Sequence, residues 1–594
     1  MEPSNENSKN ESKYWKSLRA YHNDPSVNEE KAREFAKDVT GGFDVDSMSP
    51  INRKQFLALV SASAAFAAAG CTNYRDKGEI VPYTQKPEEI TLGVANHYAS
   101  TFVENGQEYG ILIKTREGRP IKIDGNPDHP VNKGKISAKG QASILNLYDP
   151  ERLKDPMLVE SGILSKSSWK EIDTQIIAAL TAAVKEGKEI AVVSHTVTSP
   201  TAKKVFSDFA AKYPTAKFYS YELFNDLNRR SAWTKSTGSS LFPLIKWNEA
   251  KIILTLESDI LGYEGNVPEQ TRMFAENRNV DKTKNFNRLY SADGTMSSTA
   301  MNADYRLKVR PDQQLEFVLA LINEFKPTGK ISLKEFAAKY SVDTTILTQL
   351  VKDLSDNKGK SIVHAGNGLP ESVHIAVNVL NDVLGNSALY NNKQSSVDHS
   401  VITAKSEWES LVSRMKSGNV GVVVHFDSNP VYHLAQDFGY ADGLKKVKSV
   451  VSLTESQNES SEGSQFVLPI NHEFESWGDH KTRTGIFSLQ QPVISPLYNS
   501  RQKESMLLSW SLGTAESYSD DLYHTYLMNR WEKEVYPAMK MSVDFKTFWY
   551  SSLHDGVVVF NETAQSIPSV KSDALSLVNS VSSSNDFVLY LHDN

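Results

Sequence analysis

Short, almost continuously apolar stretches alternate with amphipathic helical stretches along most of the chain after residue 160. Residues 189–195 are one such apolar stretch, a polar loop follows at 196–200, and residues 201–213 have the spacing of a helix with one apolar face. The same order returns after residues 251–256, 361–366 and 421–425. Strands that are apolar throughout and are joined by helices indicate parallel sheets covered on both faces.

The pattern divides the chain into a small β-rich part and two larger α/β parts. Residues 109–115 and 119–124 read as two strands joined by a tight turn, which predicts a β-rich cap over residues 93–158. Residues 159–340 and 341–515 are predicted to form two α/β lobes with mainly parallel sheets. Such lobes usually bind ligands in the cleft at the ends of their strands.

The ends of the chain have a different character. Residues 1–50 form a polar leader, and residues 72–92 are rich in proline and read as an extended linker. Residues 516–594 are predicted to lead to a further iron–sulfur domain or to a partner, because the apolar stretch 586–592 reads as a strand with nothing to cover it.

Residues 51–71 resemble an export signal. The basic pair Arg53 and Lys54 precedes an Ala-rich apolar run that ends at Gly70 and Cys71. This run is too short to span a membrane comfortably, and it fits a twin-arginine-like signal ending in a lipoprotein motif, with Cys71 as the site of lipid attachment. The alternative is a buried Ala-rich helix that ends at a glycine cap with a core cysteine.

Composition narrows the possible chemistry. Among 594 residues the net charge is -7, which gives no indication of nucleic-acid binding. The chain has one cysteine, so it cannot form an internal disulfide or hold an iron–sulfur cluster with its own thiolates.

Some residues at the ends of predicted strands are candidates for chemistry. Glu257 and Asp259 could form an acid–base pair, although a polar strand end is the commoner explanation. His195, His364 and His425 each end an apolar strand, where a histidine with satisfied hydrogen bonds is commoner than a metal ligand.

Several motifs occur in an order that resembles the molybdopterin oxidoreductase superfamily between residues 93 and 510. The segments are GNPDHPVNKGKISAKG (125–140), YDPERLKDP (148–156), DGTMSSTA (293–300), ADYRLKVRP (303–311), TE (454–455), FVLP (466–469), ESWG (475–478), RTG (483–485) and QQP (490–492).

The resemblance implies that a cluster site has been lost. Family members with a cluster place a cysteine at the position of Ser137 and further cysteines before the first cap strand, where residues 96–101 contain none. Lys139 would lie between cluster and pterin in such a relative, and here it reads more simply as a surface or salt-bridged lysine.

The resemblance also concerns the metal and the pterin. Family members often bind molybdenum through Cys, Ser or Asp, and spacing does not single out one of Ser236, Ser239 and Ser240. The pterin loops of the family are rich in glycine, whereas the loops here keep only a weak Gly366-x-Gly368 signal. We therefore expect no catalytic, cofactor-binding or metal-binding residue and no cofactor in this chain.

We also expect the old cofactor channel to be filled by side chains or closed by contact between the lobes. The bulky or rigid residues that would fill it are His195, Pro200, Phe426 and Pro430.

The leader, the signal and the segment around residues 80–99 more narrowly resemble the iron–sulfur (B) subunits of bacterial alternative complex III, a quinol:electron-acceptor oxidoreductase. This implies a structural and assembly role, at the periplasmic face of the inner membrane, for a chain that is itself not catalytic. The implied partners are an adjoining ferredoxin-like domain with iron–sulfur clusters, integral-membrane quinol-binding subunits and subunits with haem c. The alternatives are an active molybdopterin-dependent oxidoreductase that lacks its cluster, and a nucleotide-binding lipoprotein.

Overall fold

The computed structural model describes most of the chain after residue 90. The described residues are 91, 93–160, 163–279, 281, 286–329, 331–397, 402–540, 542–560, 562, 566–579 and 587–589. The chain divides into two units, residues 1–73 and 74–594, and all described residues belong to the second. The predicted leader and signal, including Cys71, and almost all of the linker 72–92 lie outside the described residues.

The cap contains a three-stranded antiparallel sheet in the order β1-β2-β3. Its strands are β1 (Asn96–Glu104), β2 (Gln107–Arg116) and β3 (Arg119–Gly125), and helix α4 (Ala138–Leu147) follows. Successive side chains of β2 point to opposite faces of the sheet. On one face, Ile111 and Ile113 pack with Leu147 of α4 and with Phe474 from a distant segment. The cap is therefore tied to the lobes through its core.

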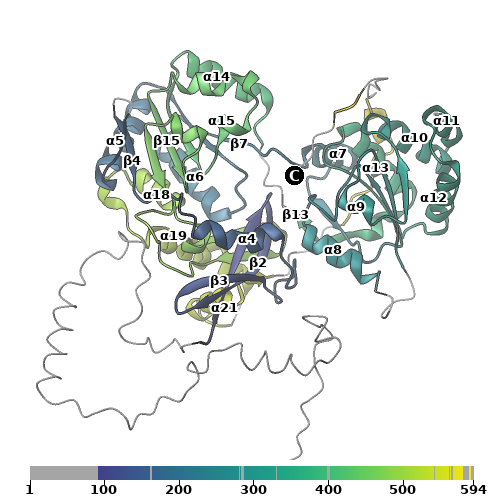
Figure 1. Cartoon of the computed structure of the whole chain (residues 1–594), viewed down its shortest axis with the longest axis horizontal. Helices are drawn as coiled ribbons and strands as arrows, with labels where there is room; N and C mark the ends of the chain where they lie inside the picture. The colour runs from purple at the N-terminus through teal and green to yellow at the C-terminus, as the bar shows by residue number, and fades with distance from the viewer. Residues whose placement is uncertain are drawn as a thin grey trace, which may run out of the picture. The chain divides into compact units, whose positions relative to one another are not determined.

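The largest sheet has seven strands in the order β5-β4-β16-β15-β14-β6-β7. From β16 to β7 the strands are parallel, and β4 and β5 extend the sheet antiparallel. The strands are β4 (Met157–Glu160), β5 (Ile163–Lys166), β6 (Glu189–Ser194), β7 (Ala216–Ser220), β14 (Val420–Phe426), β15 (Ser449–Thr454) and β16 (Phe466–Pro469). Apolar residues of α5 (Trp169–Lys185), α6 (Pro200–Lys212) and α18 (Lys503–Leu512) cover one face, and α14 (Lys405–Lys416) and α16 (Tyr440–Leu444) cover the other (Figure 1).

A second sheet is entirely parallel and has the order β11-β10-β9-β12. Its strands are β9 (Ile252–Leu256), β10 (Arg288–Asp293), β11 (Tyr305–Lys308) and β12 (Ser361–Ala365). The core of this lobe includes α10 (Gln314–Phe325), α11 (Leu333–Tyr340), α12 (Thr344–Asp356) and α13 (Glu371–Val383). These two sheets confirm the predicted α/β fold with mainly parallel sheets.

A third lobe sheet was not expected from the sequence. It has five strands in the order β19-β18-β17-β13-β8, and its pairings are antiparallel. The strands are β8 (Phe242–Ile245), β13 (Tyr390–Ser396), β17 (Gly478–Arg483), β18 (Ile486–Gln490) and β19 (Val557–Val559). Strand β17 reads GDHKTR and has no apolar side chain, yet it lies inside the sheet with Asp479, Thr482 and Arg483 buried.

The strand order corrects the expected lobe boundaries. The predicted lobes were the contiguous segments 159–340 and 341–515, but each parallel sheet takes strands from both segments. Strand β6 pairs with β14, and β9 pairs with β12, because the chain leaves the first lobe after β7 and returns at β14.

The remaining helices complete the lobes. They are α7 (Leu227–Thr237), α8 (Val267–Glu276), α9 (Ser298–Met301), α15 (Pro430–His433), α17 (Glu459–Glu462), α19 (Leu522–Arg530), the π-helical turn η8 (Trp531–Val535), α20 (Tyr536–Met539) and α21 (Phe545–Asp555).

Candidate functional site

The first candidate site is a cavity of about 430 Å³ at the carboxyl ends of the seven-stranded sheet. The loop between β6 and α6 contributes His195, and the end of β14 contributes Phe426 and Asp427. Parallel sheets usually bind ligands at this edge. Two of the residues that we expected to fill the channel, His195 and Phe426, line this space.

The amino end of α6 is occupied by a carboxylate of the chain itself. Asp479 of β17 is fully buried, and its Oδ1 accepts hydrogen bonds from Ser199 Oγ at 2.7 Å and Thr201 N at 3.2 Å. Its Oδ2 accepts one from Thr201 Oγ1 at 2.7 Å. Since Pro200 has no N–H, and Ser199 Oγ accepts from Ala202 N, the donors of this helix end are satisfied.

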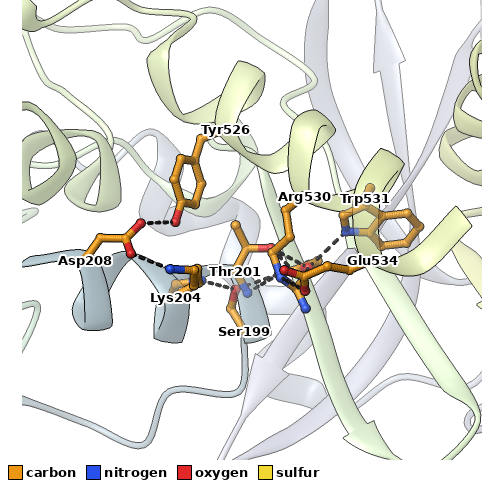
Figure 2. Close-up of polar contacts among 10 residues, drawn as sticks. Ser199, Thr201, Lys204, Asp208, Tyr526, Arg530, Trp531 and Glu534 are labelled. Carbon is orange, nitrogen blue, oxygen red and sulfur yellow. Dashed lines mark hydrogen bonds and ion pairs between the residues drawn. The ribbon is translucent and has the colours of Figure 1, made fainter. Parts of the chain in front are cut away.

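The last residue of α19, Arg530, and the next residue, Trp531, complete the binding of this carboxylate. Arg530 Nη1 and Trp531 Nε1 both donate to Asp479 Oδ2, each at 3.0 Å (Figure 2). Asp479 thus has the interactions that a bound anion would have at a helix amino end. Farther along α6, Asp208 accepts from Lys204 and Tyr526, which makes a second, more exposed contact between α6 and α19 (Figure 2).

The first cavity is rich in carboxyl groups. Burial raises the pKa of Glu455 to about 8, and Asp427 adds to this effect. Burial also raises the pKa of Glu473 to about 8, with a contribution from Glu455, and it raises the pKa of Glu504. Lys503 forms an ion pair with Asp427. With these pKa values, Glu455 and Glu473 are mostly protonated at neutral pH, and the Lys503–Asp427 pair is a charged contact of this cavity.

A second cleft, of about 690 Å³, lies at the amino end of α7 and beside the loop after β12. Arg229 and Arg230 of α7 line this cleft and share the carboxylate of Asp226, whose pKa their charges lower against the opposing effect of burial. Among the described residues, Arg229 Nε, Arg230 Nη1 and Asn367 Oδ1 are buried polar atoms without a hydrogen-bond partner. The cleft is thus lined by two guanidinium groups and an amide, whereas the amino end of α6 is occupied by Asp479.

The structure assigns different environments to the three candidate histidines. His425 is buried between Ser452 and Tyr440, at 3.0 Å from each hydroxyl, and burial lowers its pKa to about 3. His364 Nε2 accepts from Arg229 Nη1 at 3.0 Å. His195 lies at the first cavity, where burial lowers its pKa but Glu222, at 3.6 Å, raises it more.

Glu257 and Asp259 do not act together. Glu257 Oε1 accepts from Gly294 N at 2.6 Å, whereas Asp259 Oδ1 accepts from Thr299 N and Oγ1, each at 2.8 Å. Glu257 binds the start of the loop that follows β10, and Asp259 binds the start of α9. The backbone of Glu257 also explains why residue 366 is a glycine, since a Cβ on Gly366 would lie 1.8 Å from the Glu257 carbonyl oxygen.

The three candidate metal-ligand serines lie outside both cavities. Ser236 is buried within α7 and donates to the Ala232 carbonyl, while Ser239 and Ser240 belong to the loop before β8. Within the part of the chain that the structure describes, no group of three or more His, Cys, Asp or Glu side chains is placed to bind a metal ion.

Ser137 caps a helix in the structure. Its Oγ accepts from Gly140 N at 3.0 Å, which is the N-cap hydrogen bond of α4, and donates to Glu104 Oε2 at 2.6 Å. Lys139 is largely exposed and lies 3.8 Å from Glu104. Ser137, which stands where family members with a cluster have a cysteine, therefore serves as the N-cap of α4.

The sequence did not point to Asp479, Arg530, Arg229 or Arg230. Asp479 stands in a polar segment without strand periodicity, and its partner Arg530 is 51 residues away. The available signal was the ESWG segment just before it, which was recognised only as part of a family pattern. Arg229 and Arg230 are adjacent basic residues whose shared acid, Asp226, precedes a helix, and that arrangement could have been found.

Comparisons with known proteins agree with this architecture. The family model described as molybdopterin oxidoreductase matches residues 152–508. The menaquinone reductase, molybdopterin-binding-like subunit, of Nitratidesulfovibrio vulgaris is 24% identical over 504 residues, which are 77% of this chain and 71% of that protein. A nitrate reductase of Symbiobacterium thermophilum is 28% identical over 121 residues, covering 20% of this chain and 15% of that protein.

A solved structure gives the same result for the fold. Acetylene hydratase from Pelobacter acetylenicus superposes with a TM-score of 0.56 at 13% identity, covering 78% of this chain and 74% of that one. Among the described residues, no helix has the length and apolar character needed to cross a membrane.

Proposed function

The chain belongs to the molybdopterin oxidoreductase family, and on that premise we propose that it is a structural and assembly subunit of a membrane-bound respiratory complex that oxidises quinol. The complex would be of the alternative complex III type. The observation that carries this proposal is the match, along 77% of the chain, to a subunit named for a menaquinone reductase.

The family match corrects one prediction. We expected no cofactor in this chain, and that expectation is wrong, because the matching family is that of the molybdopterin oxidoreductases and a relative that matches along 77% of the chain is named a molybdopterin-binding-like subunit. The expectation rested on the missing cluster cysteines and on loops that are poor in glycine. It did not consider the two arginines of the second cleft.

The residues of the second cleft fit a molybdopterin. The cleft volume of about 690 Å³ is in the range of cofactor sites. Arg229, Arg230 and Asn367 line the cleft and would hold the group through charge and hydrogen bonds. Bound there, the cofactor would supply two-electron redox chemistry at its metal.

Partners would carry the electrons away from the quinol site. A single cysteine cannot ligate a cluster, so an adjoining ferredoxin-like domain would hold the iron–sulfur clusters and other subunits would hold haem c. Integral-membrane subunits would bind the quinol. Lipid on Cys71 would anchor the chain at the periplasmic face of the inner membrane, and two or three acyl chains would give firm attachment.

A second function is favoured by the same cleft. The unpartnered guanidinium nitrogens of Arg229 and Arg230 support an active molybdopterin-dependent oxidoreductase that lacks its cluster. The two functions predict different effects of a substitution in the second cleft on quinol oxidation. A structural subunit with Arg230→Met would still assemble and support quinol oxidation, whereas an active enzyme would assemble and lose its turnover.

The experiment is purification of the tagged chain from native membranes, followed by mass spectrometry and a quinol-oxidation assay. We expect stoichiometric iron–sulfur, membrane and cytochrome c subunits, and we expect deletion of this chain to abolish their assembly. A chain that purifies alone would contradict the proposal.

A further inference from the structure

A second buried cluster of charged groups lies where the cap meets the lobes, and its members are not lining residues of either cavity. Glu108 on β2 is fully buried, and opposite it lie Arg483 on β17 and Glu269 on α8, which are also buried. The α8 cap residue Asn266 donates to the Glu108 carbonyl at 3.5 Å, so the three elements meet at this point.

The cluster contains one cation and two carboxyl groups. Arg483 uses both terminal nitrogens on Glu269, with Nη1 at 2.8 Å from Oε1 and Nη2 bonded to Oε2. Glu108 Oε2 accepts a long hydrogen bond, 3.3 Å, from Thr482 N, and Glu108 Oε1 is a buried atom without a hydrogen-bond partner among the described residues. A buried carboxylate is stable when it is paired and well hydrogen-bonded, and the bidentate pair with Glu269 leaves Glu108 without either.

The other groups that face Glu108 do not supply a positive charge. His129, from the turn after β3, is buried and binds Ser488 Oγ of β18 at 2.8 Å, and burial with the nearby Arg483 lowers its pKa to about 3. Tyr109, the neighbour of Glu108 on β2, is a buried phenol whose pKa burial raises. At neutral pH both rings are uncharged.

We propose that Glu108 is a proton-operated latch, which holds β2 of the cap against β17 and α8 when it carries a proton and loosens that junction when it ionises. The proposal rests on the junction and does not depend on the function of the complex. Its physical basis is the single guanidinium shared unequally between two buried carboxyls.

The direction of the pH effect follows from the pKa. Burial raises the pKa of Glu108 from 4.5 to about 7, although Arg483, Thr482 and Ser488 lower it. The proton on Glu108 therefore contributes stability that is fully present below about pH 4.5 and is lost as the pH rises through about 7. Near neutrality a small change of pH changes the closed fraction of the junction.

The test uses the full chain at pH 6 and pH 8. Infrared difference spectroscopy should show a protonated buried carboxyl band that disappears between these values in the wild type and is missing in Glu108→Gln. Hydrogen-exchange protection of β2, corrected for intrinsic rates, should fall about tenfold over the same range in the wild type. It should stay constant in Glu108→Gln, and Glu117→Gln, at the exposed turn between β2 and β3, should behave as the wild type.

A second variant, Glu269→Gln, tests the proposal independently in case Glu108→Gln does not fold. Glu269→Gln frees Arg483 for Glu108, so the pH midpoint of the infrared band should move down. The latch is refuted if the wild type and Glu108→Gln share one protection profile, or if Glu269→Gln leaves the midpoint unchanged or raises it.

Discussion

The two cavities lie at comparable places in the fold and differ in the groups that line them. The first, at the ends of β6 and β14, is lined by carboxyl groups, and the helix end next to it already holds the Asp479 carboxylate. The second, at α7, keeps guanidinium nitrogens without a partner among the described residues. The position of a cleft in a fold therefore does not decide what it binds, and the side chains at each helix end do.

We expect the largest effect from removing the charge of Asp479, the carboxylate at the amino end of α6 beside the first cavity. Asp479→Asn removes a fully buried charge that five hydrogen bonds hold and leaves Arg530 with Glu534 as its ion-pair partner, which should destabilise the packing of α6 against α19 by about 3–5 kcal/mol. Native-state hydrogen exchange of the α6 amides measures this value. Asp208→Asn, which alters the more exposed contact between the same helices, is the control and should cost less than about 1 kcal/mol.

The second prediction concerns the cleft that keeps its donors. Arg230→Met removes a guanidinium from the second cleft and should weaken retention of molybdopterin roughly tenfold to a hundredfold, which corresponds to one charge-assisted hydrogen bond. Molybdenum content and released pterin fluorescence of the purified chain report the loss. Arg278→Met, which breaks the exposed pair with Asp304, is the matched control. Equal cofactor content in both variants would place the group elsewhere.

The third prediction uses the acid-rich first cavity. Burial raises the pKa of Glu473 from 4.5 to about 8, so its proton contributes stability that is fully present below about pH 4.5 and is lost as the pH rises through about 8. Glu473→Gln should be more stable than the wild type at pH 9 by roughly 1–2 kcal/mol. Thermal unfolding at pH 6 and pH 9 measures the difference. Glu462→Gln, on exposed α17, should leave the pH dependence as it is.

The smallest expected effect lies in the cap. Ser137→Ala removes the N-cap of α4 and should cost about 1 kcal/mol, while Ser137→Asn, which keeps a capping oxygen, should cost less. Thermal unfolding compares the two. Equal stability of Ser137→Ala and the wild type would show that the N-cap hydrogen bond of α4 contributes nothing to the free energy of unfolding.

The sequence predicted the parallel sheets well, because strands such as β6, β9 and β14 are apolar along their whole length and loops of polar residues follow them. It did not predict the interleaving of the lobes, since pairings such as β6 with β14 are set by contacts between residues more than two hundred positions apart. Periodicity within a segment has no information about such pairing.

The candidate sites were harder to predict for a related reason. Histidines at strand ends were easy to find, and His425 has the satisfied hydrogen bonds expected of a structural histidine. Asp479 was missed because β17 has no apolar pattern, and its polar side chains are buried only because distant partners satisfy them. The resemblance at Ser137 identified the lost cysteine position, while the capping role became visible only with the Gly140 hydrogen bond.

The most direct test of the two-cavity account is a cryo-electron microscopy map of the complex purified from native membranes. The account predicts cofactor density in the second cleft against Arg229 and Arg230, with Asp479 still bound at the amino end of α6. An anionic group at the amino end of α6, with Asp479 displaced, would contradict it.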